Sequence, residues 1–262
     1  MTAVNTFSAE RQQNMFILQQ LARRDRNKRD SSSFLGQFWQ VLNPFIYMIV
    51  MVLIFSDLFG NNDFVHYPIY VLSGTIVYSL FADGTTGCLT ALSSNKNFLI
   101  KSSIARNLYP VERVYVALIN FGFSAVIYVF FALLSGIRFS VTWLLVIPDI
   151  FLFLVMILGI GKVLAIINVE FADITYFYKI FILFVLYGSA LFYSTTRMSP
   201  TIQFIISLNP VYLAIAILRQ AVMDGIVAAP TLWLKLSAIA ISCYLLGSQF
   251  YERRVQNIVA KL

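Results

Sequence analysis

The chain has 262 residues, of which 59% are hydrophobic and only 12% are charged. Soluble domains carry about 25% charged residues, so this composition excludes most soluble enzymes and favours an integral membrane protein. The formal net charge is +7, but the basic residues form no stripe on a soluble domain, so we expect no nucleic-acid partner.

The first 36 residues form a polar, basic arm with a partial apolar face. Met15, Phe16 and Leu18, followed by Leu21 and Ala22, recur at helical spacing, which is typical of a helix lying in the headgroup plane of a membrane. The arm ends in cations that could meet lipid phosphates or acidic groups of a partner, namely Arg23, Arg24, Arg26, Lys28 and Arg29. The alternative is a solvated charge run that only fixes the topology. No cleavable signal peptide is expected, because no apolar core precedes a small-residue cleavage site.

Six apolar stretches follow the arm, and each could cross about 30 Å of hydrocarbon as a helix, the fifth only just. They are predicted at Phe38–Phe59, Tyr67–Thr86, Val111–Leu134, Trp143–Ile167, Phe177–Tyr193 and Leu232–Phe250. The predicted fold is an all-α integral membrane protein with six transmembrane helices. It includes an amino-terminal interfacial amphipathic helix and a re-entrant external helical segment before the last span.

The cationic residues predict the orientation of these spans. All Lys and Arg residues except Arg138, Arg197, Arg219 and Lys235 fall on one side, in the arm, alternate loops and the tail. This richer side is predicted to be cytoplasmic, which places both termini in the cytoplasm. The predicted organisation is a cytoplasmic arm over residues 1–36, a six-span transmembrane domain over 37–250 and a cytoplasmic tail over 251–262.

The segment Met198–Gly225 is apolar but interrupted. Asn209 and Pro210 break it, and Arg219 and Asp224 lie in its second half. A central Arg or Asp costs roughly 2.5–3.5 kcal/mol on insertion scales. A seventh span would also place the basic tail outside. We therefore predict two short helices that dip into the outer leaflet and return.

Few residues could support catalysis or ion coupling. The single histidine, His66, has no Cys, Glu or second His at metal-ligand spacing, so neither a catalytic residue nor a metal site is predicted. The string Gly159–Val163 lacks the first Gly and the Ser or Thr of a phosphate loop, which excludes ATP binding by that motif. Cys88 and Cys243 are interpreted as packing residues. Asp83 lies near the inner boundary of the second span, where it could line an aqueous path or hydrogen-bond to another helix.

Several short motifs occur in a fixed order along the chain. The run from Arg24 to Trp39, with Phe34-Leu35-Gly36 inside it and Leu42-Asn43-Pro44 after it, resembles the start of ABC-2-type export permeases. Four later motifs match that family in order and spacing: Tyr67-Pro68-Ile69-Tyr70 with Gly74; Asn95-Lys96-Asn97-Phe98-Leu99-Ile100-Lys101 with Arg106 and Tyr109-Pro110; Leu158-Gly159-Ile160-Gly161 with Asn168-Val169 and Phe171-Ala172-Asp173; and Asn209-Pro210 with Arg219 and Gly225. The size and motifs look most like the branch that exports lipid-linked polysaccharides such as O-antigen, teichoic acid or capsule. The chain departs from the family pattern at Arg26, Asp30, Ser32 and Ala105. These departures bear on the detailed shape of the arm and the loop.

The resemblance implies a homodimer of this chain with two copies of a separate ABC ATPase subunit. That partner would bind ATP and Mg, so this chain is expected to bind no cofactor. The loop from Asn95 to Lys101, together with Arg106, would couple the permease to the ATPase. A glycan path would lie between the permease halves, where aromatic faces suit the apolar edges of sugars. Its candidates are Phe38, Trp39, Tyr47, Asp83, Phe181, Phe184 and Tyr187.

The predicted function is that of the permease subunit of an ATP-driven exporter, without enzymatic activity of its own. It would move a lipid-linked polysaccharide out across the bacterial cytoplasmic membrane. Three alternatives stay open: an ABC-2 exporter of drugs or small lipids, a proton-coupled secondary transporter, and a membrane-bound glycan- or lipid-modifying enzyme. In a proton-coupled transporter, Asp83→Asn should abolish transport and no ATPase should co-purify.

Overall fold

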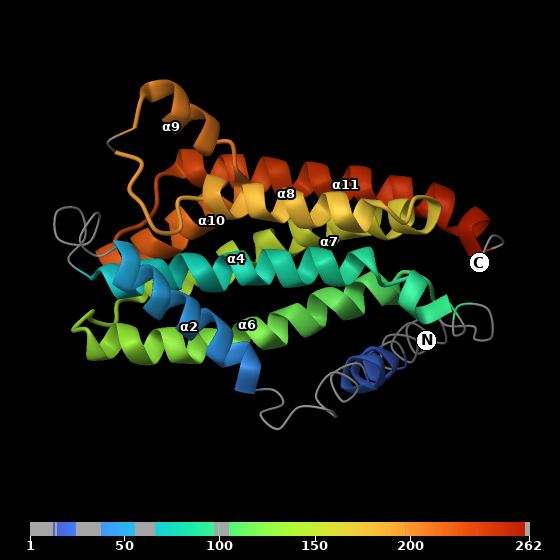
Figure 1. The fold of residues 1–262 in the computed structure, drawn as a ribbon, viewed down its shortest axis with the longest axis horizontal. Coiled ribbons are helices and arrows are strands. Elements are labelled where there is room, and N and C mark those ends of the chain that lie inside the picture. The colour runs from blue at the N-terminus through green and yellow to red at the C-terminus, as the bar shows by residue number, and fades with distance from the viewer. Residues whose placement is uncertain are drawn as a thin grey trace, which may run out of the picture.

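The computed structural model describes residues 13, 15–24, 38–55, 66–96, 99, 105–196 and 198–259. These residues form an all-helical protein, and the described part of the chain contains no strand. Long helices lie alongside one another in an elongated bundle (Figure 1). In chain order the elements are an amino-terminal helix over residues 15–24, α2 (Phe38–Phe55), α4 (Tyr67–Leu89), η2 (Ser93–Asn95), α6 (Leu108–Leu134), η3 (Val141–Leu145), α7 (Val146–Glu170), α8 (Ile174–Gly188), α9 (Pro200–Ile206), α10 (Pro210–Arg219), the π-helical turn η4 (Gln220–Asp224) and α11 (Pro230–Val259).

Three helical units of the described chain are long and apolar enough to cross a membrane. They are α6, the unit Val141–Glu170 formed by η3 and α7, and α11. The bent pair of α9 with α10–η4 becomes a fourth candidate if it counts as one span. The six stretches expected from the sequence all contain helix. Of the other three, the apolar helix in α2 and the whole of α8 are too short for a candidate span, and α4 is long enough at 23 residues but is not apolar enough. All-helical architecture is thus confirmed, whereas six crossings stay a prediction.

Helix α4 is the centre of the bundle. Most of its residues are buried, and it packs against α2, α6, α7 and α10. Its buried apolar side chains join those of α7 and α10 in one core, in which Phe81 and Phe153 lie with ring centroids 6.1 Å apart. Because α4 touches neighbours on several sides, it can hold polar side chains where three helices meet.

Helices α7 and α11 approach each other through glycine. A Cβ atom placed on Gly247 would lie under 3.0 Å from the backbone of Gly159, a separation that real Cβ atoms essentially never show. Small residues let membrane helices approach closely enough for backbone packing. At about 1.5 Å per residue, the 30 residues of α11 extend roughly 45 Å, beyond a ~30 Å hydrocarbon core. Its last turns therefore reach past the membrane-sized part of the bundle.

The chain between α8 and α11 turns sharply. α9 ends at Ile206, α10 begins at Pro210, and the two helical pieces meet at 93°. This is the break expected at Asn209 and Pro210, because proline has no N–H to continue a helix and suits its first turn. In Figure 1, α9 stands away from the bundle at the end opposite to the amino-terminal helix.

Candidate functional site

The carboxy-terminal part of α11 and the amino-terminal helix lie at the same end of the bundle (Figure 1). Their buried apolar side chains form one cluster with the segment after α4, the start of α6 and the end of α7. We call this cluster the platform, and its members are Leu21, Ala91, Leu92, Leu99, Tyr109, Ala165, Ile166, Tyr251, Val255 and Ile258. Leu18 and Ala22 of the amino-terminal helix are buried too, while Met15 and Phe16 are exposed. The predicted apolar face of this helix is thus divided between the bundle and the outside.

Polar contacts link the parts of the platform. Arg24 donates a hydrogen bond to Oδ1 of Asn95 at 2.5 Å, which ties the amino-terminal helix to η2. The hydroxyl of Tyr251 donates to the backbone oxygen of Arg106 at 2.9 Å, which ties α11 to the turn before α6. Arg254 makes two hydrogen bonds, at 3.0 and 3.1 Å, to the carboxylate of Glu170 at the end of α7. A displacement of the segment after α4 would therefore act on both the amino-terminal helix and α11.

The structure places part of the predicted coupling loop on this platform. Asn95 and Leu99 are buried, Lys96 is exposed and Arg106 is half-buried. The rest of that loop lies outside the described residues, namely Asn97, Phe98, Ile100 and Lys101. Of the predicted interfacial cations, Arg23 is exposed and Arg24 is hydrogen-bonded to Asn95. The other three lie outside the described residues, namely Arg26, Lys28 and Arg29.

At the opposite end, Arg219 is buried, with 7% of its surface exposed. Its guanidinium donates to Ser73 Oγ at 3.1 Å and to the backbone oxygen of Tyr70 at 2.9 Å, both on α4. It also donates to the backbone oxygens of Ala190 and Leu191 at 3.0 and 2.8 Å. The central carbon of the guanidinium, Cζ, lies 3.3 Å from the centroid of the Tyr70 ring. The rigid, planar fork of donors explains why arginine suits this place better than lysine.

Asn209 secures the start of α10. Its side-chain oxygen accepts a hydrogen bond from the backbone N–H of Val211 at 2.9 Å, as expected of a helix N-cap. Its amide nitrogen donates to the backbone oxygen of Gly188 and to Ser189 Oγ, both at 2.9 Å. Asn209 and Arg219 therefore join both ends of α10 to the segment that follows α8.

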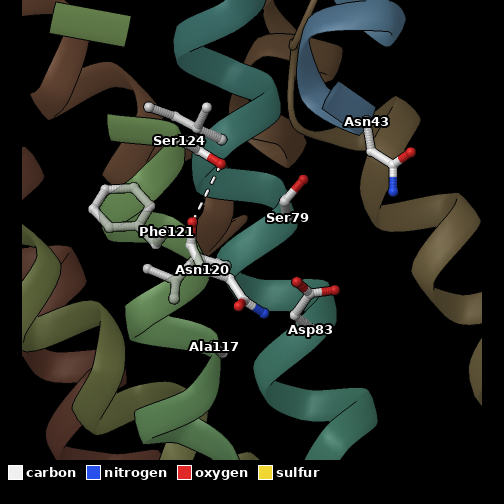
Figure 2. Close-up of a pocket in the computed structure, with 9 residues that line it drawn as sticks. Asn43, Ser79, Asp83, Ala117, Asn120, Phe121 and Ser124 are labelled. Carbon is white, nitrogen blue, oxygen red and sulfur yellow. Dashed lines mark hydrogen bonds between the residues drawn. The ribbon is translucent and has the colours of Figure 1, made fainter. Parts of the chain in front are cut away.

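A polar furrow runs between α2, α4 and α6. It consists of three adjoining hollows of about 460, 430 and 630 Å³, with Asn43 and Ser79 shared by the first two and Asp83 and Asn120 by the last two. We define the furrow by Asn43 and Tyr47 of α2, Ser79, Asp83 and Thr86 of α4, and Asn120 of α6. Figure 2 shows the side chains of Ser79, Asp83 and Asn120 facing one space, with Asn43 of α2 across from them.

The furrow is long for a feature inside an apolar bundle. Its lining on α4 runs from Thr75 to Thr90, which corresponds to about 22 Å along the helix axis. Asp83, Thr86 and Asn43 are exposed, so the furrow is open at the side of the protein. A charged side chain at the centre of a bilayer costs roughly 2.5–3.5 kcal/mol on insertion scales, so a polar furrow suits Asp83 better than a position facing lipid would.

The structure separates the predicted path residues into two groups. Tyr47 and Asp83 line the furrow, whereas Phe181, Phe184 and Tyr187 lie exposed on α8. Trp39 is exposed on α2, and the side chain of Phe38 lies outside the described residues.

Sequence reasoning missed most of the furrow's polar lining, in particular Asn43, Ser79 and Asn120. A signal was present in α4, where polar residues recur every three or four positions, at Thr75, Ser79, Asp83, Thr86 and Thr90. That spacing places them on one helix face.

The described residues contain no group of three or more His, Cys, Asp or Glu side chains that could hold a metal ion. His66 stands at the start of α4 and makes no side-chain cap.

Comparison with known proteins places the chain in a family. Residues 17–223 match the family described as "ABC-2 type transporter". The chain belongs to the ABC-2 type transporter family. Its membrane segments are thus part of a transport protein in a bacterial membrane, not of an enzyme.

Individual relatives cover most of the same region. An O-antigen export system permease protein RfbA of Klebsiella pneumoniae is 24% identical over 211 residues, which is 80% of this chain and 81% of the relative. A second RfbA protein of that organism is 24% identical over 210 residues, with the same two shares. The RfbA protein of Myxococcus xanthus is 30% identical over 162 residues, or 60% of each chain. The family match over residues 17–223 includes the furrow, Arg219 and the members of the platform that precede α11.

Proposed function

We propose that this chain is the membrane-spanning subunit of an ATP-driven exporter that moves a lipid-linked polysaccharide out across the cytoplasmic membrane. The observation that carries the proposal is the similarity to O-antigen export permeases over about four-fifths of both chains. The furrow supports it, because hydroxyl, amide and phenol groups inside an apolar bundle suit a hydroxyl-rich ligand.

In this proposal α2, α4, α6, α7, α8 and α11 each cross the membrane. The 18 residues of α2 extend about 27 Å, close to the thickness of a ~30 Å hydrocarbon core. The 15 residues of α8 extend only about 22 Å, so its crossing needs the residues that follow Gly188 or a thinned bilayer. The positive-inside rule then places the platform, residues 1–36 and residues 251–262 in the cytoplasm.

The platform is the surface through which we propose that an ATPase subunit acts. ATP and Mg would be bound by that partner, and the loop from Asn95 to Arg106 would dock on it. Arg24 and Tyr251 join this loop to the amino-terminal helix and to α11, so a push on the loop would be shared by both elements. Exposed Arg23 suits the phosphate of a lipid or of the carrier, as the neighbouring Arg26, Lys28 and Arg29 would.

The exposed faces of α8 and α2 suggest how two copies could enclose a path. Phe181, Phe184 and Tyr187 are 50%, 73% and 54% exposed, and of the residues of α8 only Tyr178 is buried. Trp39 is exposed on α2. We propose that these faces meet in a homodimer around the glycan path, with Asn209, Pro210 and Arg219 closing its external end.

A complementation experiment tests the proposal. The chain is expressed, with and without its ATPase partner, in a bacterium whose own O-antigen permease has been deleted. We expect surface polysaccharide only when both proteins are present, and none when the partner carries an inactivated nucleotide site. Export that persists without the ATPase but collapses with the proton gradient would indicate secondary transport. Resistance to drugs without surface polysaccharide would indicate an exporter of small molecules instead.

A further inference from the structure

We propose that Asn168 is a positioning residue for export, which transmits a displacement of the segment after α4 to α8 through its two side-chain hydrogen bonds. The inference deepens the proposed function and rests on it, because the displacement is the one that an ATPase subunit would cause at the platform. It names a connection between that surface and the helix whose exposed face we place beside the glycan path.

The amide of Asn168 bridges two elements that are separate in the chain. Asn168 lies near the end of α7 and is buried, with 8% of its surface exposed. Its Nδ2 donates a hydrogen bond to Ser93 Oγ of η2 at 3.1 Å, and its Oδ1 accepts one from Thr175 Oγ1 at the start of α8 at 2.8 Å. Because the two polar atoms of an amide lie in one rigid plane, a rotation that follows one partner also moves the atom bonded to the other.

The displacement would enter this connection at η2. Each of the three residues of η2 is joined to a different part of the bundle. Asn95 accepts from the amino-terminal helix, and Ser94 accepts from Arg113 of α6 at 3.2 Å. Ser93 is the residue that continues through Asn168 to α8. The loop proposed to dock on the ATPase begins at Asn95, so a push on it reaches η2 directly.

Helix α8 is the element that could respond. Of its residues only Tyr178 is buried, whereas α7 buries residues along its length and packs against both α4 and α11. Residues 171–173 separate the two helices, so α8 is not a continuation of α7. An element with few buried contacts moves at less cost than one packed on several sides. The bond from Thr175 to Asn168 would therefore move α8 against a fixed α7.

The first test asks whether the connection exists and needs neither partner nor glycan. Backbone hydrogen exchange is measured in the full-length chain in detergent. Ser93→Ala should speed exchange at residues 174–180 roughly two- to tenfold, as expected when one hydrogen bond of ordinary strength is lost. Thr175→Val should do the same. The double variant should be no faster than Thr175→Val, because both changes interrupt one path.

A matched control for this test is Asn107→Ala. Asn107 is exposed at the start of α6 and its side chain forms no helix cap, so exchange in α8 should stay as in the wild type. Exchange in α8 that responds to Thr175→Val but not to Ser93→Ala would overturn the inference, because the path would then end at Asn168.

The second test follows the transmission in the complex with the ATPase partner. Leu183 of α8 is 52% exposed, and Leu183→Cys in a chain with Cys88→Ala and Cys243→Ala carries an environment-sensitive fluorophore. Its emission should change when the partner is trapped with ATP and vanadate. With Asn168→Ala this change should be lost, and glycan exported per ATP hydrolysed should fall roughly two- to tenfold, while the partner still co-purifies and hydrolyses ATP.

Two milder variants separate transmission from folding. Thr175→Val removes one hydrogen bond and should lower the emission change and the export per ATP, even if Asn168→Ala fails to fold. Thr175→Ser keeps the hydroxyl and should restore both readouts.

An emission change that survives Asn168→Ala and Thr175→Val would overturn the inference and leave the proposed function intact. So would a wild-type complex that exports glycan without any emission change. Failure of the ATPase to co-purify, or of the wild-type complex to export, would contradict the proposed function, whereas hydrogen exchange would still support or overturn the connection.

Discussion

At the scale of single residues, Arg219 illustrates how a charge is accommodated inside this bundle. Its guanidinium is buried, yet it makes four hydrogen bonds to α4 and to the segment after α8. Hydrogen bonds from charged groups contribute about 1.5–3 kcal/mol each. Removing the guanidinium would also leave two buried carbonyl oxygens and one partly buried one without this donor. Arg219 therefore holds the segment between α8 and α11 against α4.

We predict that Arg219→Ala destabilises the folded protein by about 3 kcal/mol or more, because several buried acceptors lose their partner at once. Arg219→Lys should recover only part of this, since a single ammonium cannot reproduce the fork. The measurement is thermal unfolding in detergent. Arg138→Ala, which removes an exposed cation from the turn after α6, is the control and should shift the midpoint little. An Arg219→Ala protein as stable as this control would show that the hydrogen bonds of Arg219 do not stabilise the fold.

At the scale of elements, α7 and α11 approach each other closely. The contact depends on Gly159 and Gly247, whose backbones leave no room for a side chain between them. α11 continues from this contact to the platform, where Tyr251, Val255 and Ile258 are buried. The glycine contact therefore positions the helix that also holds the platform together.

We predict that Gly247→Ala destabilises the protein, because its Cβ would force the two helices apart. Gly122→Ala is the matched control. A Cβ at Gly122 meets nothing within 4 Å, and alanine is favoured over glycine in a helix by about 1 kcal/mol. The control should thus be neutral or slightly stabilising in the same detergent unfolding measurement. If both variants unfold at the same temperature, the close approach of α7 and α11 does not exist.

These elements differ in how far the sequence predicts them. The break at Asn209 and Pro210 is predictable, because the local chemistry of proline decides it. The pairing of Gly159 with Gly247 is not, because the register of two helices far apart in the chain depends on their packing. Asp83 could be selected as a single polar residue in a span, but its convergence with Asn43 and Asn120 requires three helices to be placed. The apolar face of residues 15–22 was recognisable, whereas what covers Leu18, Leu21 and Ala22 was not.

At the scale of the whole molecule, the exposed face of α8 bears on how two copies of the chain could meet. The aromatic face of α8 is exposed, and α8 adds only Tyr178 to the buried residues of the bundle. The proposed homodimer would cover this face, which would otherwise contact lipid. The furrow, open beside α2, would then face the space that the two copies enclose.

We predict that two copies of the chain can be joined through α8. In a background with Cys88→Ala and Cys243→Ala, a short bifunctional thiol reagent should cross-link Phe184→Cys chains into dimers in the membrane. Phe151→Cys on α7 is 65% exposed and serves as the control, which should stay monomeric. Efficient cross-linking of the control with none at Phe184→Cys would place the dimer interface elsewhere.

The most direct measurement of the central claim is ATP-dependent movement of a lipid-linked glycan in proteoliposomes. The vesicles contain this chain with its ATPase partner, the glycan starts on the side where ATP is supplied, and its arrival on the other side is detected by a lectin. We expect arrival to require ATP hydrolysis and to stop when the partner's nucleotide site is inactivated. Arrival at the same rate without ATP or without the partner would contradict the account.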